Sequence, residues 1–474
     1  MNIEKMQTFI HNTWEQSIIP ALCEYVSIPC KSVAFDAEWE KNGYIDQAIQ
    51  LISAWCHAQQ IFDMRFSIHK LPGHTPILLM DIPGQCSETV LLYGHLDKQP
   101  EMDGWLEGLA PWKPVIKDGK LYGRGSADDG YAVFSALTAI KALQEQKIPH
   151  ARCIILIETS EESGSVDLPV YMQHLKKEIG KPDLIICLDS GADNYNQLWC
   201  TTSLRGMVNA ALTVEILTEG VHSGAASGVV PSSFRILRQL LDRLENVATG
   251  EVLLKEFYVD IPNNRILEAE KIADTIGDEV WKNYPWIKGS HPSRISNKSL
   301  ILNRTWMPTL SIIGAGDIPT IKNAGNVIRP RTSLVLSLRT PPTCNSEMAS
   351  KALKKALEYD PPYGAKISVD ILNSAHGWNA PELQNWLHHA IDEASLIHFG
   401  KNAMYKGEGG SIPFMHMLGQ EFPQAQFVIT GVLGPHSNAH GPNEFLHIDT
   451  AKKVTSCVAS ILAAHAMQIR DHRS

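Results

Sequence analysis

Apolar segments of strand length that run directly into acidic residues or histidine constrain the fold of this chain most. Three such segments are "TVLLYG" (89–94), "CIILIE" (153–158) and "LIICLD" (184–189). The first is followed at once by His95-Leu96-Asp97. Between the first two, residues 131–146 have helical spacing. Apolar strands that alternate with helices predict a sheet buried on both faces, and therefore an α/β sandwich.

The length of the chain and its middle part predict a second domain. A chain of 474 residues exceeds what one hydrophobic core usually supports. Residues 207–217 alternate like a half-exposed strand, and 232–247 have the apolar stripe of a helix. We therefore expect an α/β protein in which a smaller α+β domain is inserted into the first domain. The expected boundaries are 1–206 and 381–474 for the first domain, and 207–380 for the insertion.

Charge and cysteine content exclude several classes of protein. The net charge is −9 and no basic block is present, which argues against a nucleic-acid partner. No apolar stretch reaches membrane-spanning length, and the N-terminus has the pattern of an amphipathic helix rather than a signal peptide. The nine cysteines are odd in number and form no C-x-x-C pair. Reduced, buried thiols in a cytoplasmic protein are the expectation.

Polar groups follow each apolar strand, and ligand sites in open α/β sheets form outside the carboxyl ends of strands. They are His95-Leu96-Asp97, Asp128-Asp129, Glu161-Glu162, Asp189, and the segment that contains His436, His440 and Glu444. Each group taken alone is equally typical of a turn or a helix cap. Together, two histidines and several carboxylates are a donor set for zinc, manganese or cobalt. There are more carboxylates than one ion needs, so we expect a two-metal site.

The spacing within two of these groups suggests separate roles. Neighbours on an extended segment point in opposite directions, so one of Glu161 and Glu162 would bind metal while the other acts as general base. Asp97 stands two residues after His95, on the same side of the chain. Its carboxylate would hold the second ring nitrogen of His95 and fix the tautomer, as is usual for a metal-binding histidine.

Five motifs, in this order and spacing, resemble a known family. They are "GHLDKQP", "GRGSADDG", "EESGS", "CLDSG" and "AHGPNE". The sequence is similar to the dinuclear metallopeptidases that include carnosinase, cytosolic nonspecific dipeptidase, glutamate carboxypeptidase and the aminoacylases, and it resembles the dipeptidase branch most. The resemblance implies that the first domain is a mixed-sheet catalytic domain and that the insertion is a ferredoxin-like domain that serves as lid and dimerisation domain.

The resemblance implies a role for each residue of the metal site. His95 and Asp189 would be the terminal ligands of one ion, Glu162 and His440 those of the other, and Asp128 would bridge both. Glu161 would be the general base and would act on a water that bridges the metals. Asp97 would orient His95. A cis peptide bond between Asp128 and Asp129 is also implied. Two divalent ions per subunit are expected, with Zn²⁺ preferred over Mn²⁺ or Co²⁺.

Residues outside the metal site are assigned by the same resemblance. His222, in "GVHSG", would reach across a homodimer and polarise the scissile carbonyl. Asn326 would contact the substrate, and Arg339 would clamp its carboxylate. The backbone of Gly409, Gly410 and Ser411, in "GEGGSIP", would hold that carboxylate as well. A loop histidine and a salt-bridged strand-end arginine remain alternatives for His222 and Arg339.

The expected reaction is the hydrolysis of dipeptides or other short peptides with a free C-terminal carboxylate. An N-acyl- or N-carbamoyl-amino-acid amidohydrolase with the same metal site is the alternative, and its substrate would be an acylated amino acid. A catalytically silent binding protein is the rival from another class, although no ligand or base is missing. This chain departs from the family pattern at Gly130, because relatives often have a lysine after the paired aspartates. The lysine is not a metal ligand, so we expect the difference to affect substrate preference rather than the metal site.

Overall fold

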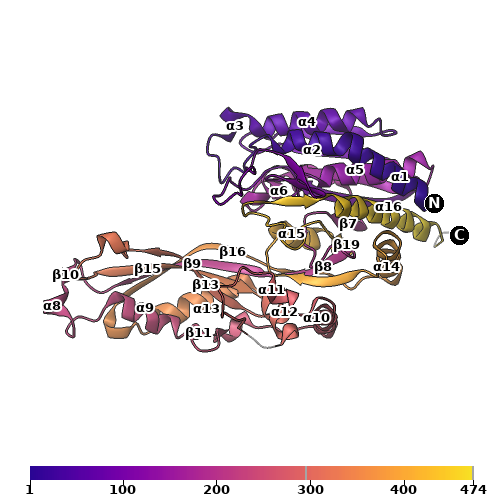
Figure 1. Ribbon diagram of the computed structural model, residues 1–474. Coiled ribbons are helices and arrows are strands. Elements are labelled where there is room, and N and C mark those ends of the chain that lie inside the picture. Colours follow the sequence, from indigo (N-terminus) through magenta and orange to yellow (C-terminus); the bar gives the residue numbers. More distant parts are fainter. Residues whose placement is uncertain (294–295, 472–474) are drawn as a thin grey trace. The chain divides into compact units, whose positions relative to one another are not determined.

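The computed structural model describes residues 1–293 and 296–471. The chain forms two compact units, which are described separately (Figure 1). The first contains residues 1–202, 380–406 and 417–474, and the second contains 203–379 and 407–416. The expected breaks at 206/207 and 380/381 fall at 202/203 and 379/380, and a third difference is larger. Residues 407–416 were assigned to the catalytic domain but lie in the second unit, because Arg205 Nε donates to Gly409 O at 3.1 Å and so holds this segment there.

A six-stranded mixed sheet forms the centre of the first unit, in the order β1-β2-β6-β3-β7-β19. Its strands are β1 (Arg65–His69), β2 (Ile77–Ile82), β3 (Cys86–His95), β6 (Ala151–Glu158), β7 (Leu184–Cys187) and β19 (Gln426–Ile429). Strands β6, β3, β7 and β19 run parallel to one another, whereas β1 and β2 pair antiparallel. Because the parallel strands are buried on both faces, they have the continuous apolar sequences expected of such strands.

Helices cover this sheet. They are α1 (Ile3–Thr13), the π-helical turn η1 (Trp14–Ile18), α2 (Ile19–Val26), α3 (Trp39–Asn42), α4 (Tyr44–Ala58), α5 (Ala132–Glu145), α6 (Leu168–His174), α7 (Lys176–Ile179), α14 (Asn385–Phe399), α15 (Pro413–Glu421, shared between the two units) and α16 (Ile448–Asp471). The expected amphipathic N-terminal helix is present as α1, which buries Met6 and Ile10. No helix within the described residues is both long and apolar enough to cross a bilayer.

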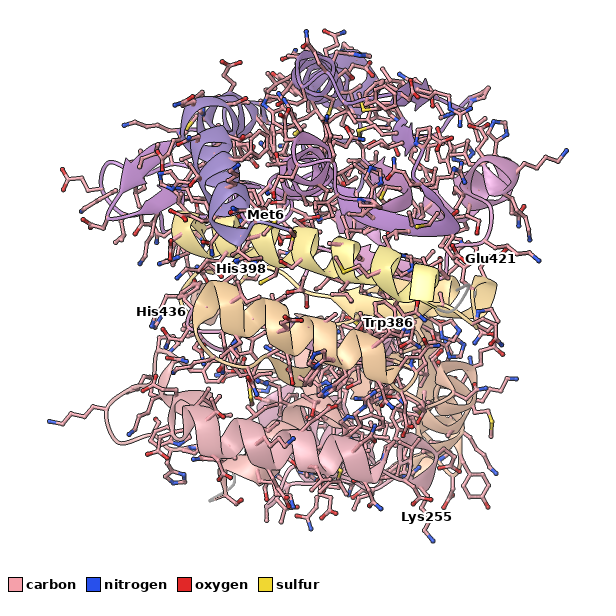
Figure 2. All side chains as sticks on the ribbon, turned by 90° about the vertical axis from the view of Figure 1, so that its right-hand side faces the viewer. Met6, Lys255, Trp386, His398, Glu421 and His436 are labelled. Atoms are coloured by element: carbon pink, nitrogen blue, oxygen red, sulfur yellow. The ribbon has the colours of Figure 1, made fainter. Side chains whose placement is uncertain are left out.

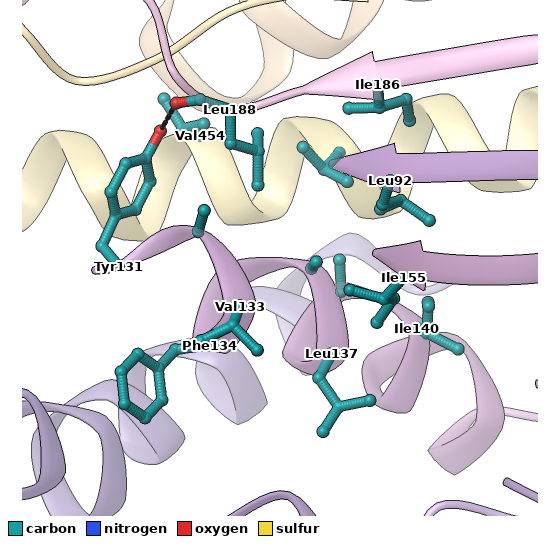
Figure 3. Packing of buried hydrophobic residues seen from close by; sticks show 14 of the residues in the cluster. Leu92, Tyr131, Val133, Phe134, Leu137, Ile140, Ile155, Ile186, Leu188 and Val454 are labelled. Atoms are coloured by element: carbon teal, nitrogen blue, oxygen red, sulfur yellow. Dashed lines mark hydrogen bonds between the residues drawn. The ribbon is translucent and has the colours of Figure 1, made fainter. Parts of the chain in front are cut away.

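Figure 3 shows how α5 packs on the sheet. Ile140 of α5 lies beside Ile155 of β6, Leu137 points away from the strands, and both α5 side chains are fully buried in one cluster with Ile155 and Leu92 of β3. Burial of one such side chain stabilises the fold by about 1.5–3 kcal/mol. At the start of the helix, the Tyr131 hydroxyl donates to the main-chain oxygen of Leu188. This packing fixes the start of α5, and with it the paired aspartates that precede the helix.

The second unit has a four-stranded antiparallel sheet in the order β13-β15-β9-β16. Its strands are β9 (Gly206–Glu215), β13 (Thr309–Gly316), β15 (Arg331–Thr340) and β16 (Lys366–Ala375). Helices α9 (Ser233–Leu241) and α13 (Ser346–Glu358) cover one face, and apolar side chains of both pack against the sheet. The chain order β9-α9-β13-β15-α13-β16 is that of a ferredoxin-like fold, so this expectation is confirmed.

Short elements complete both units. They are β4 (Val115–Lys117), β5 (Lys120–Tyr122), β20 (Phe445–His447), β8 (Trp199–Leu204), β17 (Trp378–Asn379), β18 (Met404–Glu408), β10 (Val221–His222), α8 (Ser223–Ala226), β14 (Val327–Ile328), β11 (Glu245–Asn246), β12 (Glu251–Val252), α10 (Asn263–Ile276), α11 (Glu279–Lys282) and α12 (Asn297–Thr305). The helix expected over 232–247 ends earlier, at Leu241, because Glu245–Asn246 pairs with β12 instead of continuing the helix.

Candidate metal centre

Four parallel strands of the first unit bring the expected site residues to one edge of the sheet. Strand β3 ends at His95, β6 leads into Glu161-Glu162, and β7 leads into Asp189. The loop after β19 carries His440. Because all four strands point the same way, their carboxyl ends lie at the same edge, where ligand sites of such sheets form.

The five expected metal ligands form two groups that share Asp128. His95, Asp128 and Asp189 offer donor atoms within 4.8 Å of one another, and so do Asp128, Glu162 and His440. The two carboxylate oxygens of Asp128 face different histidines. Oδ1 lies 3.4 Å from His95 Nε2, and Oδ2 lies 3.0 Å from His440 Nε2. This is the arrangement of a bridging carboxylate between two cation positions.

The outer carboxylate of each group lies near its histidine. Asp189 Oδ2 is 3.7 Å from His95 Nε2, and Glu162 Oε2 is 3.2 Å from His440 Nε2. Each group therefore contains one imidazole nitrogen, one terminal carboxylate and one oxygen of Asp128. His436, the other histidine of the same loop, belongs to neither group among the described residues.

The acidic residues of this centre are electrostatically unfavourable without cations. Burial, followed by repulsion from Asp128, raises the pKa of Asp189 to about 7. Burial and repulsion from Asp189 raise the pKa of Glu161 well above its usual range. Burial lowers the pKa of His440, but hydrogen bonds with Asp128 and Glu162 outweigh this effect and raise the pKa to about 11. Divalent cations would relieve the repulsion among the carboxylates and would compete with protons for the histidines.

The donor set fits a pair of divalent cations. His95 is fully buried, and its Nε2 has no hydrogen-bond partner among the described residues. Its other ring nitrogen, Nδ1, lies 3.0 Å from the main-chain oxygen of Asp97. With Nδ1 protonated by this contact, Nε2 carries a lone pair directed at the oxygens of Asp128 and Asp189. A buried lone pair facing two carboxylates is the geometry of a metal ligand.

Asp97 connects the two strands that carry His95 and the paired glutamates. Its main-chain oxygen bonds to His95, while its carboxylate oxygen lies farther from the ring nitrogen, at 3.5 Å. The carboxylate instead accepts the main-chain N–H groups of Glu161 (3.1 Å) and Glu162 (3.0 Å). The contact between His95 and Asp97 was expected, but the main-chain oxygen makes it, and the carboxylate mainly holds the glutamate turn.

The paired glutamates lie in a helical turn, which contradicts the extended segment inferred from the sequence. Glu161–Ser163 is one 3₁₀ turn, in which Gly164 N donates to Glu161 O at 2.6 Å. The turn forms because the Asp97 carboxylate gathers two consecutive N–H groups and because Gly164 adopts a left-handed conformation (φ 84°). The Glu162 side chain accepts a hydrogen bond from Gln99 Nε2 at 2.6 Å.

Glu444 holds the loop that presents Asp128. This buried carboxylate accepts N–H groups of Gly125 (3.0 Å), Ala127 (3.3 Å) and Asp128 (3.3 Å) with one oxygen, and Arg124 Nη1 (2.8 Å) with the other. The Asp128-Asp129 peptide bond is cis, as the family resemblance implied. Glu444 was expected only as part of a motif, and no role was expected for Arg124 or Gln99, because these contacts join distant parts of the chain.

Gly130, which stands where relatives often carry lysine, is required by the packing of this chain. A Cβ atom at this position would lie 2.2 Å from Tyr25 Cε1 and 2.5 Å from Gly125 O. The Tyr25 ring is fixed, because its hydroxyl donates to Leu96 O at 2.7 Å and Lys98 Nζ lies 3.9 Å from its centroid. A lysine side chain therefore has no room here.

The expected substrate-binding residues all lie in the second unit, in two places. His222 of β10 pairs with Val327 of β14, and Ser223 N donates to Asn326 O at 2.9 Å. His222 and Asn326 therefore lie together on an exposed two-stranded antiparallel sheet. Arg339 is at the other end of β15, where its Nη1 donates to Ser411 Oγ at 3.0 Å. Gly409 lies in the same loop as Ser411.

Two cation positions at the carboxyl ends of parallel strands, with the half-buried Glu161 as an additional carboxylate that interacts electrostatically with Asp189, fit a metal-dependent hydrolase. The model of peptidase family M20/M25/M40 matches residues 91–464. The chain therefore belongs to this family of metallopeptidases, whose members hydrolyse peptide bonds, and the suspected family is confirmed.

Individual relatives are similar over most of their length. The cysteinylglycine-S-conjugate dipeptidase of Corynebacterium striatum is 26% identical over 77% of this chain and 79% of its own. The Cys-Gly metallodipeptidase DUG1 of Saccharomyces cerevisiae is 27% identical over 79% of this chain and 78% of its own. The structure of human carnosine dipeptidase 1 has a TM-score of 0.78 at 21% identity and covers 98% of this chain and 99% of that one. The last likeness confirms the mixed α/β fold.

Proposed function

We propose that this protein is a dipeptidase that hydrolyses short peptides with a free C-terminal carboxylate, using two divalent cations. The observation that carries the proposal is Asp128, whose two oxygens face His95 at 3.4 Å and His440 at 3.0 Å. His95 and Asp189 would hold one cation, Glu162 and His440 the other, and Asp128 both. The dipeptidase names of the relatives support the substrate class. Zn²⁺ is the proposed ion, with Mn²⁺ or Co²⁺ as alternatives.

Glu161 is the proposed general base. When bound, the cations would act as Lewis acids and would lower the pKa of a bound water to about 7. Burial and the repulsion from Asp189 raise the pKa of Glu161, which moves it toward the range in which a carboxylate both accepts and returns a proton. Glu161 would take the proton of the attacking water and pass it to the leaving amine. Asp97 would keep Glu161 in place through the hydrogen bond from Glu161 N.

The second unit would recognise the substrate. Arg339 and the Ser411 hydroxyl are 3.0 Å apart. Next to Ser411, the Gly410 position has open space, since a Cβ there would meet nothing within 4 Å. We propose that Arg339 and the main-chain N–H groups of Gly409, Gly410 and Ser411 bind the terminal carboxylate of the peptide. This would restrict the enzyme to substrates with a free C-terminus.

A homodimer with a shared active site is part of the proposal. The two-stranded sheet that carries His222 and Asn326 lies just before Arg331, the first residue of β15, and Arg339 lies near the other end of this strand. Eight residues of strand span about 26 Å, whereas the two residues of a dipeptide span about 7 Å. One chain therefore does not place His222 and Arg339 on the same dipeptide, so His222 and Asn326 would act on a substrate held by the partner.

The proposed dimer interface lies on the second unit. Strand β13 is an edge of its sheet, and it exposes Ile312 (45%) and Ile313 (60%). Ile321 (98%) and Val229 (82%) are also exposed on this unit. An open strand edge with exposed apolar side chains favours association with a second copy. None of the nine cysteines, all of which lie within the described residues, forms a disulfide bond, and a cytoplasmic location is proposed on this ground.

The experiment that tests the function uses chelator-treated protein reloaded separately with zinc, manganese or cobalt. Ala-Xaa and Xaa-Gly dipeptides are offered beside N-acetyl- and N-carbamoyl-amino acids, with the Glu161→Gln variant as control. Metal-restored cleavage of the dipeptides, absent from the control, is the expected result. Turnover confined to the acylated or carbamoylated amino acids would overturn the dipeptidase assignment.

A further inference from the structure

A pocket in the second unit is not used by the proposed reaction. It has a volume of about 430 Å³, and its lining residues come from helices α11 and α12, the segment between them, Arg205 before β9 and the start of β13. Trp281, Tyr284, Trp286 and Leu300 contribute apolar surface to its wall. The size is in the range of small-molecule sites, and an aromatic lining is typical of them.

The aromatic side chains of the pocket are held in place but remain open to a ligand. Trp286 Nε1 donates to Trp281 O at 2.6 Å, and the rings of Tyr284 and Trp286 make an edge-to-face contact at 6.4 Å. Even so, Tyr284 is 51% exposed and Trp286 41% exposed. Large aromatic surfaces left in water favour binding of an apolar group that covers them.

Two arginines, Arg205 and Arg304, line the same pocket. Arg205 is buried, and it donates only to neutral groups among the described residues: Gly409 O, Thr309 Oγ1 and Asn303 O. Burial, together with repulsion by Arg339 and Arg304, lowers the pKa of Arg205 to about 10. No acidic residue belongs to the described lining of the pocket. Arg205 is therefore a buried cation in the pocket wall, and the hydrogen-bond partners described for it include no carboxylate.

Arg205 also connects the pocket to the proposed carboxylate site. Its Nε holds Gly409 O at 3.1 Å, and its main-chain oxygen accepts a hydrogen bond from Ser411 Oγ at 2.6 Å. The same Ser411 hydroxyl receives Arg339 Nη1. A Cβ atom at Gly409 would lie 3.0 Å from Arg304 O and 3.2 Å from Arg205 Nη2. The carboxylate loop and the pocket therefore share these two arginines.

We infer that the aromatic pocket is the subsite for the side chain of the C-terminal substrate residue, and that it selects large apolar or aromatic residues. The inference rests on the proposed function for the position of the substrate carboxylate. A residue bound by its carboxylate at Arg339 and Ser411 carries its side chain within a few bonds of that group. Peptides that end in phenylalanine or leucine would fill the pocket, whereas peptides that end in glycine would leave it empty.

The test compares Ala-Gly, Ala-Leu and Ala-Phe as substrates of the wild type and of Tyr284→Ala. The wild type is expected to have at least a tenfold higher kcat/KM with Ala-Phe than with Ala-Gly, mainly through a lower KM, since burying an apolar side chain discriminates by about 10- to 200-fold. Tyr284→Ala should lose fivefold or more with Ala-Phe and stay within twofold with Ala-Gly. Tyr359→Ala, at a tyrosine that is 74% exposed outside the pocket, is the matched control and should behave like the wild type.

Two further measurements keep the inference separate from the proposed function. Leu300→Trp, which fills the pocket, should weaken Ala-Phe selectively; equal losses with Ala-Gly and Ala-Phe would overturn the subsite. Calorimetry with N-acetyl-L-phenylalanine and N-acetylglycine needs no turnover, so it decides about the pocket even if no dipeptide is cleaved. The phenylalanine derivative should bind at least tenfold more tightly, and Tyr284→Ala should remove this difference. Equal affinities, or binding that does not compete with a dipeptide substrate, would overturn the inference.

Discussion

The carboxylate of Asp97 accepts a hydrogen bond from the main-chain nitrogen of Glu162 at 3.0 Å. Its second oxygen accepts the nitrogen of Glu161 at 3.1 Å. Asp97 thereby fixes the turn that carries both a proposed metal ligand and the proposed base, while its main-chain oxygen fixes the ring of His95. The position of both groups depends on a residue that itself touches neither cation position.

Asp97→Asn should weaken metal binding by about 10- to 100-fold, because an amide accepts only one of the two N–H groups and places its own N–H₂ against the other. Competition with a metal-sensitive dye measures the affinity. Asp46→Asn, at an exposed side chain of helix α4 that pairs with Lys70, is the matched control and should leave the metal affinity unchanged. Unchanged affinity in Asp97→Asn would show that the turn keeps its geometry without the carboxylate.

Mixing two inactive variants tests the shared site. Glu161→Ala removes the proposed base, and His222→Ala removes a residue that is proposed to act on the partner's substrate. A hybrid dimer contains one site with both groups intact, so a 1:1 mixture after subunit exchange should recover activity. About a quarter of the wild-type rate is expected if subunits combine at random, since half of the dimers are hybrids and each has one complete site. No recovery after exchange has been verified would contradict action in trans.

Gly130→Ala should destabilise the first unit strongly. The added Cβ would meet the Tyr25 ring at 2.2 Å and Gly125 O at 2.5 Å, and overpacking of this kind costs about 1–3 kcal/mol or more. The thermal midpoint should therefore fall by several degrees. Gly325→Ala is the control, because a Cβ there meets nothing within 4 Å. Equal midpoints for the two variants would contradict the packing described for Gly130.

His398 makes stability depend on pH. It lies on α14 beside α16 (Figure 2), its Nδ1 is 3.0 Å from Gln7 Nε2, and its Nε2 is 2.9 Å from Ser460 Oγ. Gln7 Nε2 is a donor, so Nδ1 accepts and the ring is held neutral. Burial lowers the pKa of His398 to about 4. Because the unfolded chain takes up the proton first, near pH 6.5, this residue stabilises the fold above that pH and loses the contribution as the pH falls toward 4.

The non-titrating variant His398→Gln measures this effect. Between pH 7.5 and 5, the wild type should lose about 1–3 kcal/mol more stability than the variant, which is read from urea unfolding at both values. The comparison between the two proteins cancels the titration of all other groups. If both proteins lose the same stability over this interval, the account of His398 is wrong.

The sequence was sufficient for the parallel strands β3, β6 and β7 and for the residues that follow them, but not for β1 and β2. Apolar runs such as 89–94 indicate buried strands. Because the carboxyl ends of parallel strands lie at one edge of a sheet, His95, Glu162 and Asp189 are then expected to lie close together. The conformation at Glu161-Glu162 was inferred wrongly, because the carboxylate that makes the turn, Asp97, is 64 positions away. Local sequence contains no signal for such a contact.

Long-range contacts also account for what was missed elsewhere. Glu444 supports the loop of Asp128 from 316 positions away. The segment 407–416 lies in the second unit because of a bond between Arg205 and Gly409 that no periodicity reveals. The meaning of Gly130 depends on the position of Tyr25, which only the packed structure gives. Patterns in the sequence predict which strand precedes a residue, whereas these supports depend on what the folded chain brings beside it.

Metal counting on three proteins tests the central claim most directly. Wild type, Glu161→Gln and Glu162→Gln are equilibrated with limiting free zinc and analysed by elemental mass spectrometry, and dipeptide turnover is measured on the same samples. We expect two ions per chain in the wild type and in Glu161→Gln, with activity lower by about 10²–10⁴-fold in the latter. We expect fewer than two ions per chain in Glu162→Gln. A single ion in the wild type, or loss of metal from Glu161→Gln, would contradict a two-cation centre bridged by Asp128 with Glu161 as its base.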